Sequence, residues 1–471
     1  MTKKDDGPIS EIMRGQALDK ALLEKAWVYA RDYLDKVLDR PVFPVKEAIQ
    51  KLEELRHELP EEPGDPGEVL DRLHRIGSPA TVAQMGGRYF GFVNGGVVPA
   101  SLAAKWLVDA WDQNAALYVM SPVVSVLEEV CEEWLVDLFN LPKGTATGFV
   151  GGSATANLCG LAAGRDHLLA KNGWDASSMG LFGAPEVRVV IGAGAHSTVY
   201  KALSVLGLGR ERLVKVPTDG QGRLRPDGLP KLDERTLLIL QAGNVSSGAF
   251  DPFAEICPRA RAAGAWIHID GAFGLWAEAS PRLRSLTKGI ELADSWSVDA
   301  HKTLNAPYDS GIVLCRQRED LTRALQMSGS YIVSGGNRDG MRYTLDMSRR
   351  ARAVELWACL MALGRRGTAE LVEDLHDKAV LFAHALEKEG FSILNEVCFN
   401  QVLVSCGGPD LTERTLALIQ ESGECWCGSA RWEGEPVMRV SVCSYRTTAG
   451  DIERSARAFV RAREEARRGT G

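Results

Sequence analysis

Two stretches of the chain decide the fold: WIHIDGAFG at residues 266–274 and SVDAHKT at residues 297–303. Each contains a short β-rich run that ends in an acidic residue, Asp270 in the first stretch and Asp299 in the second. Such runs, followed by Gly, Ala or polar residues, predict buried strands. In open α/β sheets, ligands bind outside the carboxyl ends of the strands, so we expect both acids at a binding edge.

Further runs of the same kind extend this pattern to a sheet of seven strands. The expected strands are at residues 148–151, 187–191, 213–216, 237–241, 266–270, 295–298 and 312–315. Most are separated by stretches long enough for crossover helices, which predicts an α/β fold with a mostly parallel sheet and helices on both faces. Only a turn separates the last two strands, so that pair should be antiparallel.

The composition and the pattern of expected helices and strands divide the chain into three parts. Residues 1–103 read as a helical segment for dimerisation, residues 104–350 as the large α/β domain, and residues 351–471 as a small α+β domain. The first part carries apolar residues at helical spacing between Leu22 and Leu38. For the last part we expect helices at 348–363, 371–389 and 449–468, and strands at 391–394, 401–405 and 437–442.

Composition excludes several classes of protein. The 471 residues are 45% hydrophobic and 25% charged, with a net charge of −7, so nothing indicates binding to nucleic acid or to an anionic membrane. No apolar run reaches the ~18–20 residues of a membrane span. The N-terminal MTKKDDGPIS lacks the apolar core of a secretory signal, and the ten cysteines suit reduced thiols. We therefore expect a cytoplasmic protein.

Two further motifs suggest a site on the α/β domain. The run GGSATAN at 151–157 would open a helix, where small residues let backbone N–H groups approach a phosphate. It matches neither the dinucleotide fingerprint nor the P-loop, and Gly/Ser turns into helices are common. His196, in AHST, also follows a strand, although a histidine there more often makes a structural hydrogen bond.

Lys302 completes the set. A lysine at the mouth of a sheet is a candidate Schiff-base residue, although His301-Lys302 could also be an exposed loop. Asp270 could bind a metal, a ribose or a ring nitrogen, or merely cap a loop. The interval of 302 − 270 = 32 residues is about one βαβ unit. A pyridoxal phosphate (PLP) site needs a lysine, an acid for the pyridine nitrogen and a phosphate cup, and this order of motifs supplies them.

Longer segments extend this match beyond the individual motifs. They are RYFGFVNGG, SPVVSVLEE, GFVGGSATAN, GAHSTVYKA, QAGNVSSGAFDP, HIDGAFG, SVDAHKTLNAPYDSG and MSRRARAVELWA. With these segments the chain resembles the group II PLP-dependent decarboxylases of fold type I, the aspartate aminotransferase fold, which include aromatic-amino-acid, histidine and glutamate decarboxylases. The resemblance implies a homodimer that converts an L-amino acid to its amine and CO₂.

The resemblance also implies roles for single residues. Lys302 would anchor the cofactor, Asp270 would pair with the ring nitrogen, and His196 would stack on the ring. The phosphate would be held by Ser153, Ala154, Thr155 and His301. Three more residues would lie close to the cofactor: Asn244, Ala272 and Asp299.

The substrate and the proton donor are less well marked. The resemblance places Phe92 and Asn94 near the substrate side chain, within an aromatic-rich stretch that favours an aromatic or bulky apolar substrate. Arg439 would lie near the substrate carboxylate, although it could almost equally well be an arginine at the edge of a sheet with no part in the site. Tyr331 and Tyr343, in the Gly-rich segment 328–348, are candidate proton donors or merely packing residues.

Two alternatives stay open. The same cofactor could serve an aminotransferase, a carbon–carbon lyase or an aldehyde synthase, because the fold does not fix which bond breaks. The chain could also be a scaffold without activity, against which the intact Lys302, Asp270 and His196 argue. Cys425-Trp426-Cys427 has the wrong spacing for a zinc ribbon, so we expect no metal site and a structural role for this motif.

Overall fold

The computed structural model describes residues 9–325 and 336–468. Its centre is a seven-stranded sheet in the order β2-β8-β7-β6-β5-β3-β4. The seven predicted strands are confirmed as β2 (Ala146–Val150), β3 (Arg188–Gly192), β4 (Val214–Val216), β5 (Thr236–Gln241), β6 (Trp266–Asp270), β7 (Ser295–Asp299) and β8 (Gly311–Cys315).

The directions of these strands place the acids as expected. Strands β4, β3, β5, β6 and β7 pair in parallel, whereas β8 runs antiparallel to both β7 and β2, which confirms the predicted antiparallel pair. In the β6–β7 ladder, Asp270 lies opposite Ser297, so the carboxyl ends of both strands reach the same edge of the sheet.

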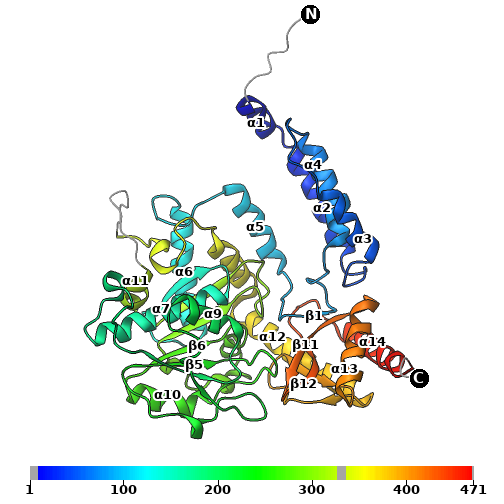
Figure 1. The fold of residues 1–471 in the computed structure, drawn as a ribbon. Coiled ribbons are helices and arrows are strands. Elements are labelled where there is room, and N and C mark those ends of the chain that lie inside the picture. The colour runs from blue at the N-terminus through cyan, green and yellow to red at the C-terminus, as the bar shows by residue number, and fades with distance from the viewer. Residues whose placement is uncertain (1–8, 326–335, 469–471) are drawn as a thin grey trace, which may run out of the picture.

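Helices cover both faces of this sheet (Figure 1). Along β5, Leu238 and Leu240 belong to one apolar cluster, whereas Leu237 and Ile239 belong to another. This alternation means that both faces are buried, as in other doubly covered parallel sheets. The helices of the domain are α6 (Pro122–Leu138), α7 (Ser153–Lys171), α8 (Ala176–Met179), α9 (Ser197–Val205), α10 (Phe253–Ala262) and α11 (Arg318–Leu325).

A smaller five-stranded sheet lies beside the large domain (Figure 1). Its strand order is β1-β11-β12-β10-β9, and it packs with α13 (Pro409–Ser422) and α14 (Ala449–Arg468). Its strands are β1 (Tyr89–Phe90), β9 (Ser392–Ile393), β10 (Gln401–Ser405), β11 (Trp426–Trp432) and β12 (Glu435–Ser441). The sequence predicted neither β1 nor β11, and β1 brings the N-terminal segment into this sheet by pairing with β11 in parallel.

A long helical segment, α12 (Arg352–Lys388), joins the two domains. Leu356 in its first half belongs to the core of the large domain, and Phe382 in its second half belongs to the core of the small domain. The sequence predicted two helices here. This prediction is confirmed, because Gly364 breaks the helical geometry with φ 62°, a conformation that glycine adopts at little cost, and two helices meet there at a kink.

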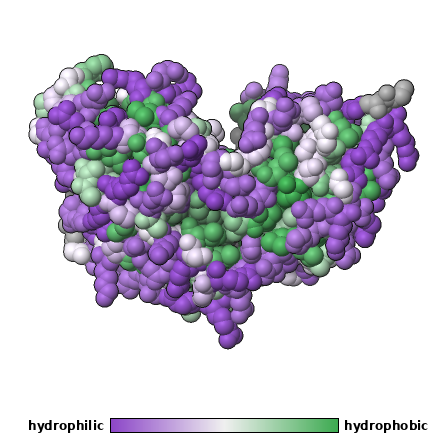
Figure 2. All heavy atoms as spheres, turned by 90° about the horizontal axis from the view of Figure 1, so that it is seen from below, coloured by the Kyte–Doolittle hydropathy of each residue, from purple (hydrophilic) through white to green (hydrophobic). Residues whose placement is uncertain are grey.

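The N-terminal helices α1 (Ile9–Leu18) and α2 (Ala21–Lys36) project away from both domains (Figure 1) and bury no residue within the chain. They are followed by α3 (Lys46–Gln50), α4 (Pro66–Arg72) and α5 (Pro99–Trp111). Figure 2 shows a mostly polar surface on one face of the molecule, with apolar residues gathered toward its middle. None of the helices within the described ranges is long and apolar enough to cross a membrane.

Candidate active site

Lys302 lies at the carboxyl edge of the large sheet. Its Nζ is 3.1 Å from Oδ2 of Asp299, the last residue of β7. Asp299 is 1% exposed and accepts two hydrogen bonds from Ser153, one from the backbone N (2.6 Å) and one from Oγ (2.7 Å). The carboxylate therefore ties the lysine to the first turn of α7.

The loop before α7 forms a narrow cradle. A Cβ added at Gly311 would lie 2.3 Å from the Cα of Gly152, so the two backbones can approach this closely only because position 311 is glycine. Ala154 is exposed and Thr155 is partly exposed in the first turn of α7. Helix N-termini favour anions, so this turn suits a phosphate group.

His301 faces the same cradle. Its Nδ1 accepts a hydrogen bond from the backbone N of Ser310 (3.2 Å), which leaves the ring proton on Nε2, 3.7 Å from Oδ2 of Asp299. Burial lowers the pKa of His301, so the ring is mostly neutral near pH 7. Tyr308 stacks on this ring with centroids 4.3 Å apart.

Asp270 and His196 line one small cavity. Asp270 Oδ1 accepts from the backbone N of Ala272 (3.2 Å) and lies 3.4 Å from Ser297 Oγ. His196 caps α9, with Nδ1 accepting from the backbone N of Thr198 (3.3 Å). Burial lowers the pKa of His196, and the negative charge of Asp270 opposes that shift. The shared cavity brings together Asp270, the predicted partner of the ring nitrogen, and His196, the predicted stacking residue.

Asn244 and Arg439 both contact the turn at residues 244–246. Asn244 Oδ1 accepts from the backbone N of Ser246 (2.9 Å), so the amide is used to hold a turn. Arg439, on β12, reaches over from the small domain and donates from Nη1 to the carbonyl of Val245 (3.2 Å). Burial lowers the pKa of Arg439, and its Nε has no hydrogen-bond partner within the described residues. A carboxylate ligand would supply one.

The loop at residues 91–96 packs directly on the lysine. A Cβ at Gly95 would lie 2.2 Å from the carbonyl oxygen of Lys302. Phe92 and Val93 have positive φ values of 53° and 58°, which is rare for side chains of this size and is typical of constrained functional segments. Asn94 Oδ1 accepts a hydrogen bond from the Tyr308 hydroxyl (2.8 Å), which closes this loop onto the site.

An aromatic stack borders the loop. Phe92 is 60% exposed and stacks on Trp426 at 5.4 Å, and Trp426 stacks on Tyr89 at 5.2 Å. The flanking Cys425 and Cys427 are fully buried, and they carry no disulfide. The Cys-Trp-Cys motif therefore has the packing role that the sequence suggested, but its tryptophan also faces the site.

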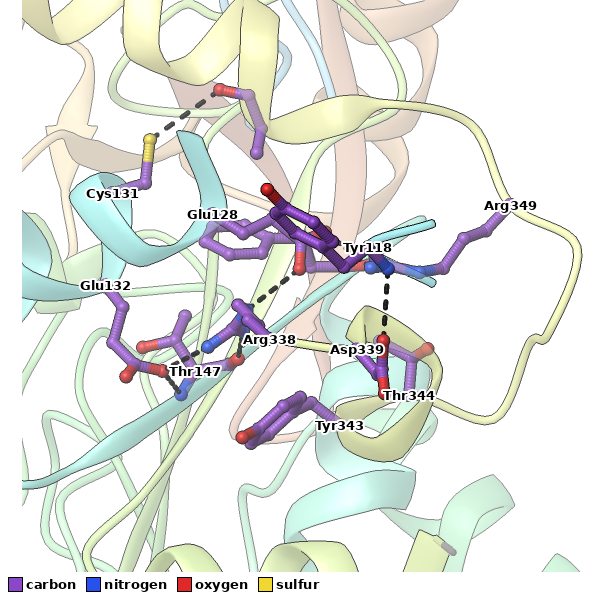
Figure 3. Close-up of polar contacts among 12 residues, drawn as sticks. Tyr118, Glu128, Cys131, Glu132, Thr147, Arg338, Asp339, Tyr343, Thr344 and Arg349 are labelled. Carbon is purple, nitrogen blue, oxygen red and sulfur yellow. Dashed lines mark hydrogen bonds and ion pairs between the residues drawn. The ribbon is translucent and has the colours of Figure 1, made fainter. Parts of the chain in front are cut away.

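The two tyrosine candidates are not part of this group. Tyr331 lies outside the described residues. Tyr343 is buried, its hydroxyl accepts from Arg318 Nη1 (2.6 Å), and its ring lies 4.2 Å below the guanidinium of Arg338 (Figure 3). The geometry gives Tyr343 a packing role and offers no support for proton donation by its hydroxyl.

Sequence reasoning gave no role in the site to Tyr308 or Trp426. Both lie in segments without a regular pattern of apolar residues, and only the fold brings them next to His301 and Phe92. The nearest signal for Tyr308 was its place a few residues after Lys302.

The donor set at this edge fits PLP. Lys302 supplies the amine, Asp270 supplies a carboxylate on the neighbouring strand, and the first turn of α7 supplies a cradle for the phosphate. An amine, an acid and a phosphate cup are the parts that PLP needs. Here the amine and the acid follow the adjacent parallel strands β7 and β6, and the cup lies at the start of α7, after β2. The fold and the site therefore define a PLP-dependent enzyme of fold type I.

Comparison with known proteins makes the assignment specific. Residues 49–405 match the pyridoxal-dependent decarboxylase conserved domain, and the chain belongs to this family of PLP-dependent amino acid decarboxylases. It is 26% identical to the aromatic-L-amino-acid decarboxylase of Sus scrofa over 90% of this chain and 92% of that protein. It is 27% identical to the acidic amino acid decarboxylase GADL1 of Mus musculus over 89% of this chain and 77% of that protein.

Solved structures show the same fold. The Oryza sativa protein TDC, solved with PLP and tryptamine, has a TM-score of 0.86 at 21% identity over 95% of this chain and 97% of that chain. Mouse CSAD has a TM-score of 0.85 at 21% identity over 94% of this chain and 98% of that chain. The chain is thus similar to decarboxylases whose names refer to different substrates, aromatic and acidic, so similarity alone leaves the substrate undetermined.

Proposed function

We propose that this enzyme decarboxylates an aromatic or bulky apolar L-amino acid to its amine and CO₂. PLP, when bound, supplies the electron sink that takes up the electron pair of the broken Cα–carboxylate bond. The protein's task is to orient that bond, to keep the ring nitrogen protonated and to return a proton to Cα.

The residues of the site divide this task. Lys302 would anchor PLP through its amine. Asp270 would hold the proton on the ring nitrogen, and His196 would cover one face of the ring. Arg439 binds the substrate carboxylate, which is supported by its burial and by its unpartnered Nε. Tyr331 is our candidate for the proton donor to Cα, with His196 or Lys302 as alternatives.

The aromatic stack is the observation that carries the proposed substrate class. Phe92 stays 60% exposed although its loop packs on Lys302, and Trp426 supports it from behind. An exposed aromatic ring beside a reactive lysine offers an apolar face to a substrate side chain. An acidic side chain would meet a ring there rather than a cation.

A substrate screen tests this proposal. CO₂ release should be measured for each proteinogenic amino acid, and we expect the highest kcat/KM for aromatic or large apolar substrates. Phe92→Ala should then raise KM by about tenfold, since an aromatic contact of this kind contributes roughly 0.5–1.5 kcal/mol beyond its buried area. Phe182→Ala removes a fully exposed ring from another loop and serves as the control. A preference for glutamate or aspartate would refute the proposed substrate class.

Product analysis tests the type of reaction. An amine-forming decarboxylase releases amine and CO₂ in equal amounts. An aldehyde synthase on the same fold would release aldehyde in place of amine, and an aminotransferase would release no CO₂. The Rhodiola rosea 4-hydroxyphenylacetaldehyde synthase shares this fold with a TM-score of 0.80 at 19% identity, so the fold does not separate the two outcomes.

We also propose that the enzyme is a homodimer. The projecting helices α1 and α2 expose Ile12, Met13, Leu23, Trp27 and Val28, each at least 42% exposed. An apolar stripe on helices that contact no core is expected to be covered by a second copy. We accordingly assign residues 1–103 to dimerisation, 104–350 to the PLP-binding domain and 351–471 to the small domain.

Sedimentation tests the dimer. The double variant Leu23→Glu/Trp27→Glu should shift the wild-type dimer toward monomer and lower its activity, whereas an active monomeric wild type would refute the assignment. A cytoplasmic location is supported by the ten cysteines, none of which forms a disulfide.

A further inference from the structure

A buried hydrogen-bond chain lies behind Asp270. The indole Nε1 of Trp266 donates to Ser295 Oγ (3.0 Å), and that oxygen is 2.8 Å from Nδ1 of His268. The other ring nitrogen of His268, Nε2, is 2.8 Å from Asn157 Oδ1. The side chains of Ser295, His268 and Asn157 are fully buried.

The donors in this chain can be assigned in order. An indole N–H can only donate, so Ser295 accepts from Trp266. An amide oxygen can only accept, so Nε2 of His268 is the donor to Asn157 Oδ1, and Nδ1 is left to accept from the Ser295 hydroxyl. Burial lowers the pKa of His268 to about 3, so the ring is neutral and carries its proton on Nε2. That proton is donated to Asn157 Oδ1, which therefore points toward β6 and β7 as an acceptor.

The same amide oxygen competes with Asp270 for one proton. Ser297 Oγ lies 2.6 Å from Asn157 Oδ1 and 3.4 Å from Asp270 Oδ1. A serine hydroxyl has a single proton, and the shorter contact takes it. Apart from Ser297, the hydrogen-bond donor found for Asp270 among the described residues is the backbone N of Ala272 at 3.2 Å.

The direction of the Ser297 proton matters for Asp270. Each hydrogen bond donated to a carboxylate stabilises its charged form and weakens its hold on a shared proton. A carboxylate that pairs with a protonated ring nitrogen holds it best when few other donors draw on its charge. We propose that Asn157 is a positioning residue, which holds the Ser297 hydroxyl proton away from Asp270 and so keeps this carboxylate free for the ring nitrogen of PLP.

The packing of α7 fixes Asn157 in this place. A Cβ at Gly160 would lie 2.8 Å from Cε1 of His268, and one at Gly164 would lie 2.7 Å from the indole of Trp266. The two glycines let α7 approach β6 closely enough for its Asn157 to reach the strands. The helix that begins at the phosphate cradle thereby also controls the acid at the other end of the cofactor.

This inference rests on the proposed role of Asp270, and its test needs only PLP and no substrate. The variants are Asn157→Ala, Ser297→Ala, the double variant and Asp270→Asn. Each is titrated with PLP by absorbance to obtain the dissociation constant. Protein loaded with ¹⁵N-labelled PLP then gives the chemical shift of the ring nitrogen by NMR. Thermal unfolding of each PLP-free variant reports its stability.

Asn157→Ala should free the Ser297 proton to turn to Asp270. We expect the PLP dissociation constant to rise about tenfold, which is the size of a hydrogen bond to a charged group, and the ¹⁵N shift to move toward that of an unprotonated nitrogen. Ser297→Ala alone should stay within about threefold of wild type, since Asp270 loses only a long contact.

The double variant decides between positioning and packing. If Asn157 acts through the Ser297 proton, removing the hydroxyl as well should return affinity and ¹⁵N shift to those of Ser297→Ala, although the double variant is less stable than either single one. A double variant no better than Asn157→Ala would overturn the proposal, as would wild-type affinity in Asn157→Ala.

Two further variants keep the test decisive. Should Asn157→Ala fail to fold, Asn157→Val fills the volume without an acceptor and carries the same expectation. Asp270→Asn should lose PLP affinity more than any of these variants. Wild-type affinity in Asp270→Asn would overturn the role of Asp270 and this inference together, whereas the double variant can overturn the inference alone.

Discussion

Arg338→Met should strongly destabilise the large domain, because Arg338 holds together two buried glutamates (Figure 3). Its Nε donates to Glu128 Oε2 (3.0 Å) and its Nη1 donates to Glu132 Oε2 (2.8 Å). In this variant Glu128 would still form its ion pair with Arg349, and Glu132 would still form its ion pair with Arg318. Removing one partner of a buried ion pair costs about 3–5 kcal/mol. The remaining arginines place the expected loss near the lower limit, about 3 kcal/mol.

Thermal unfolding measures this loss. At roughly 2–4 °C per kcal/mol for a domain of this size, Tm should fall by about 6–12 °C. Arg366→Met is the matched control, since Arg366 is 93% exposed and only 3.4 Å from Glu370, so it should change stability by less than about 0.5 kcal/mol. Equal Tm values for the two variants would refute the argument that burial makes the Arg338 contacts strong.

Lys302→Ala should abolish turnover and the borohydride-reducible link to PLP, and label mapped to any other lysine would contradict the assignment. Burial raises the pKa of Asp251 from 3.8 to about 7, so folding favours its protonated form. The free energy of unfolding should therefore fall as pH rises from about 4 to 7. Urea unfolding at pH 5 and pH 8 should show a smaller difference in Asp251→Asn than in the wild type. Tyr343→Phe loses the 2.6 Å bond from Arg318 and should lower the unfolding free energy by about 1 kcal/mol without changing the ratio of amine to CO₂; aldehyde formation would instead make Tyr343 the proton donor.

The sequence predicted the large sheet well because its strands are buried on both faces. Continuous apolar runs such as the one at 237–241 leave little choice of structure. Strand β1 has only two residues, and its pairing with β11 depends on chain more than 300 residues away, so no local pattern could reveal it. The predicted break between two helices is confirmed, since the backbone leaves helical geometry at Gly364.

The site was predictable where residue type and order carry the chemistry. Asp270 ends β6 and Lys302 lies in the turn just after β7, and the parallel sheet brings these strand ends together. The contact between Asn157 and Ser297 could not be predicted, because the two residues are 140 positions apart and a polar residue inside a helix or strand gives no periodic signal. Tyr343 shows the reverse case, since its place in a Gly-rich segment made it a candidate proton donor and the fold buries it instead.

The close contact between α7 and β6 has a consequence for how such chains can diverge. A side chain at position 160 would overlap His268, and one at position 164 would overlap Trp266. A relative that gains a side chain at position 160 or 164 must lose bulk at the partner position on the strand in the same lineage, or the helix must move outward. Paired substitutions at these positions, 268 − 160 = 108 and 266 − 164 = 102 residues apart, should therefore keep the phosphate cradle in place relative to the acid, whereas an unpaired gain of a side chain on the helix should mark branches of the family in which the cradle has shifted.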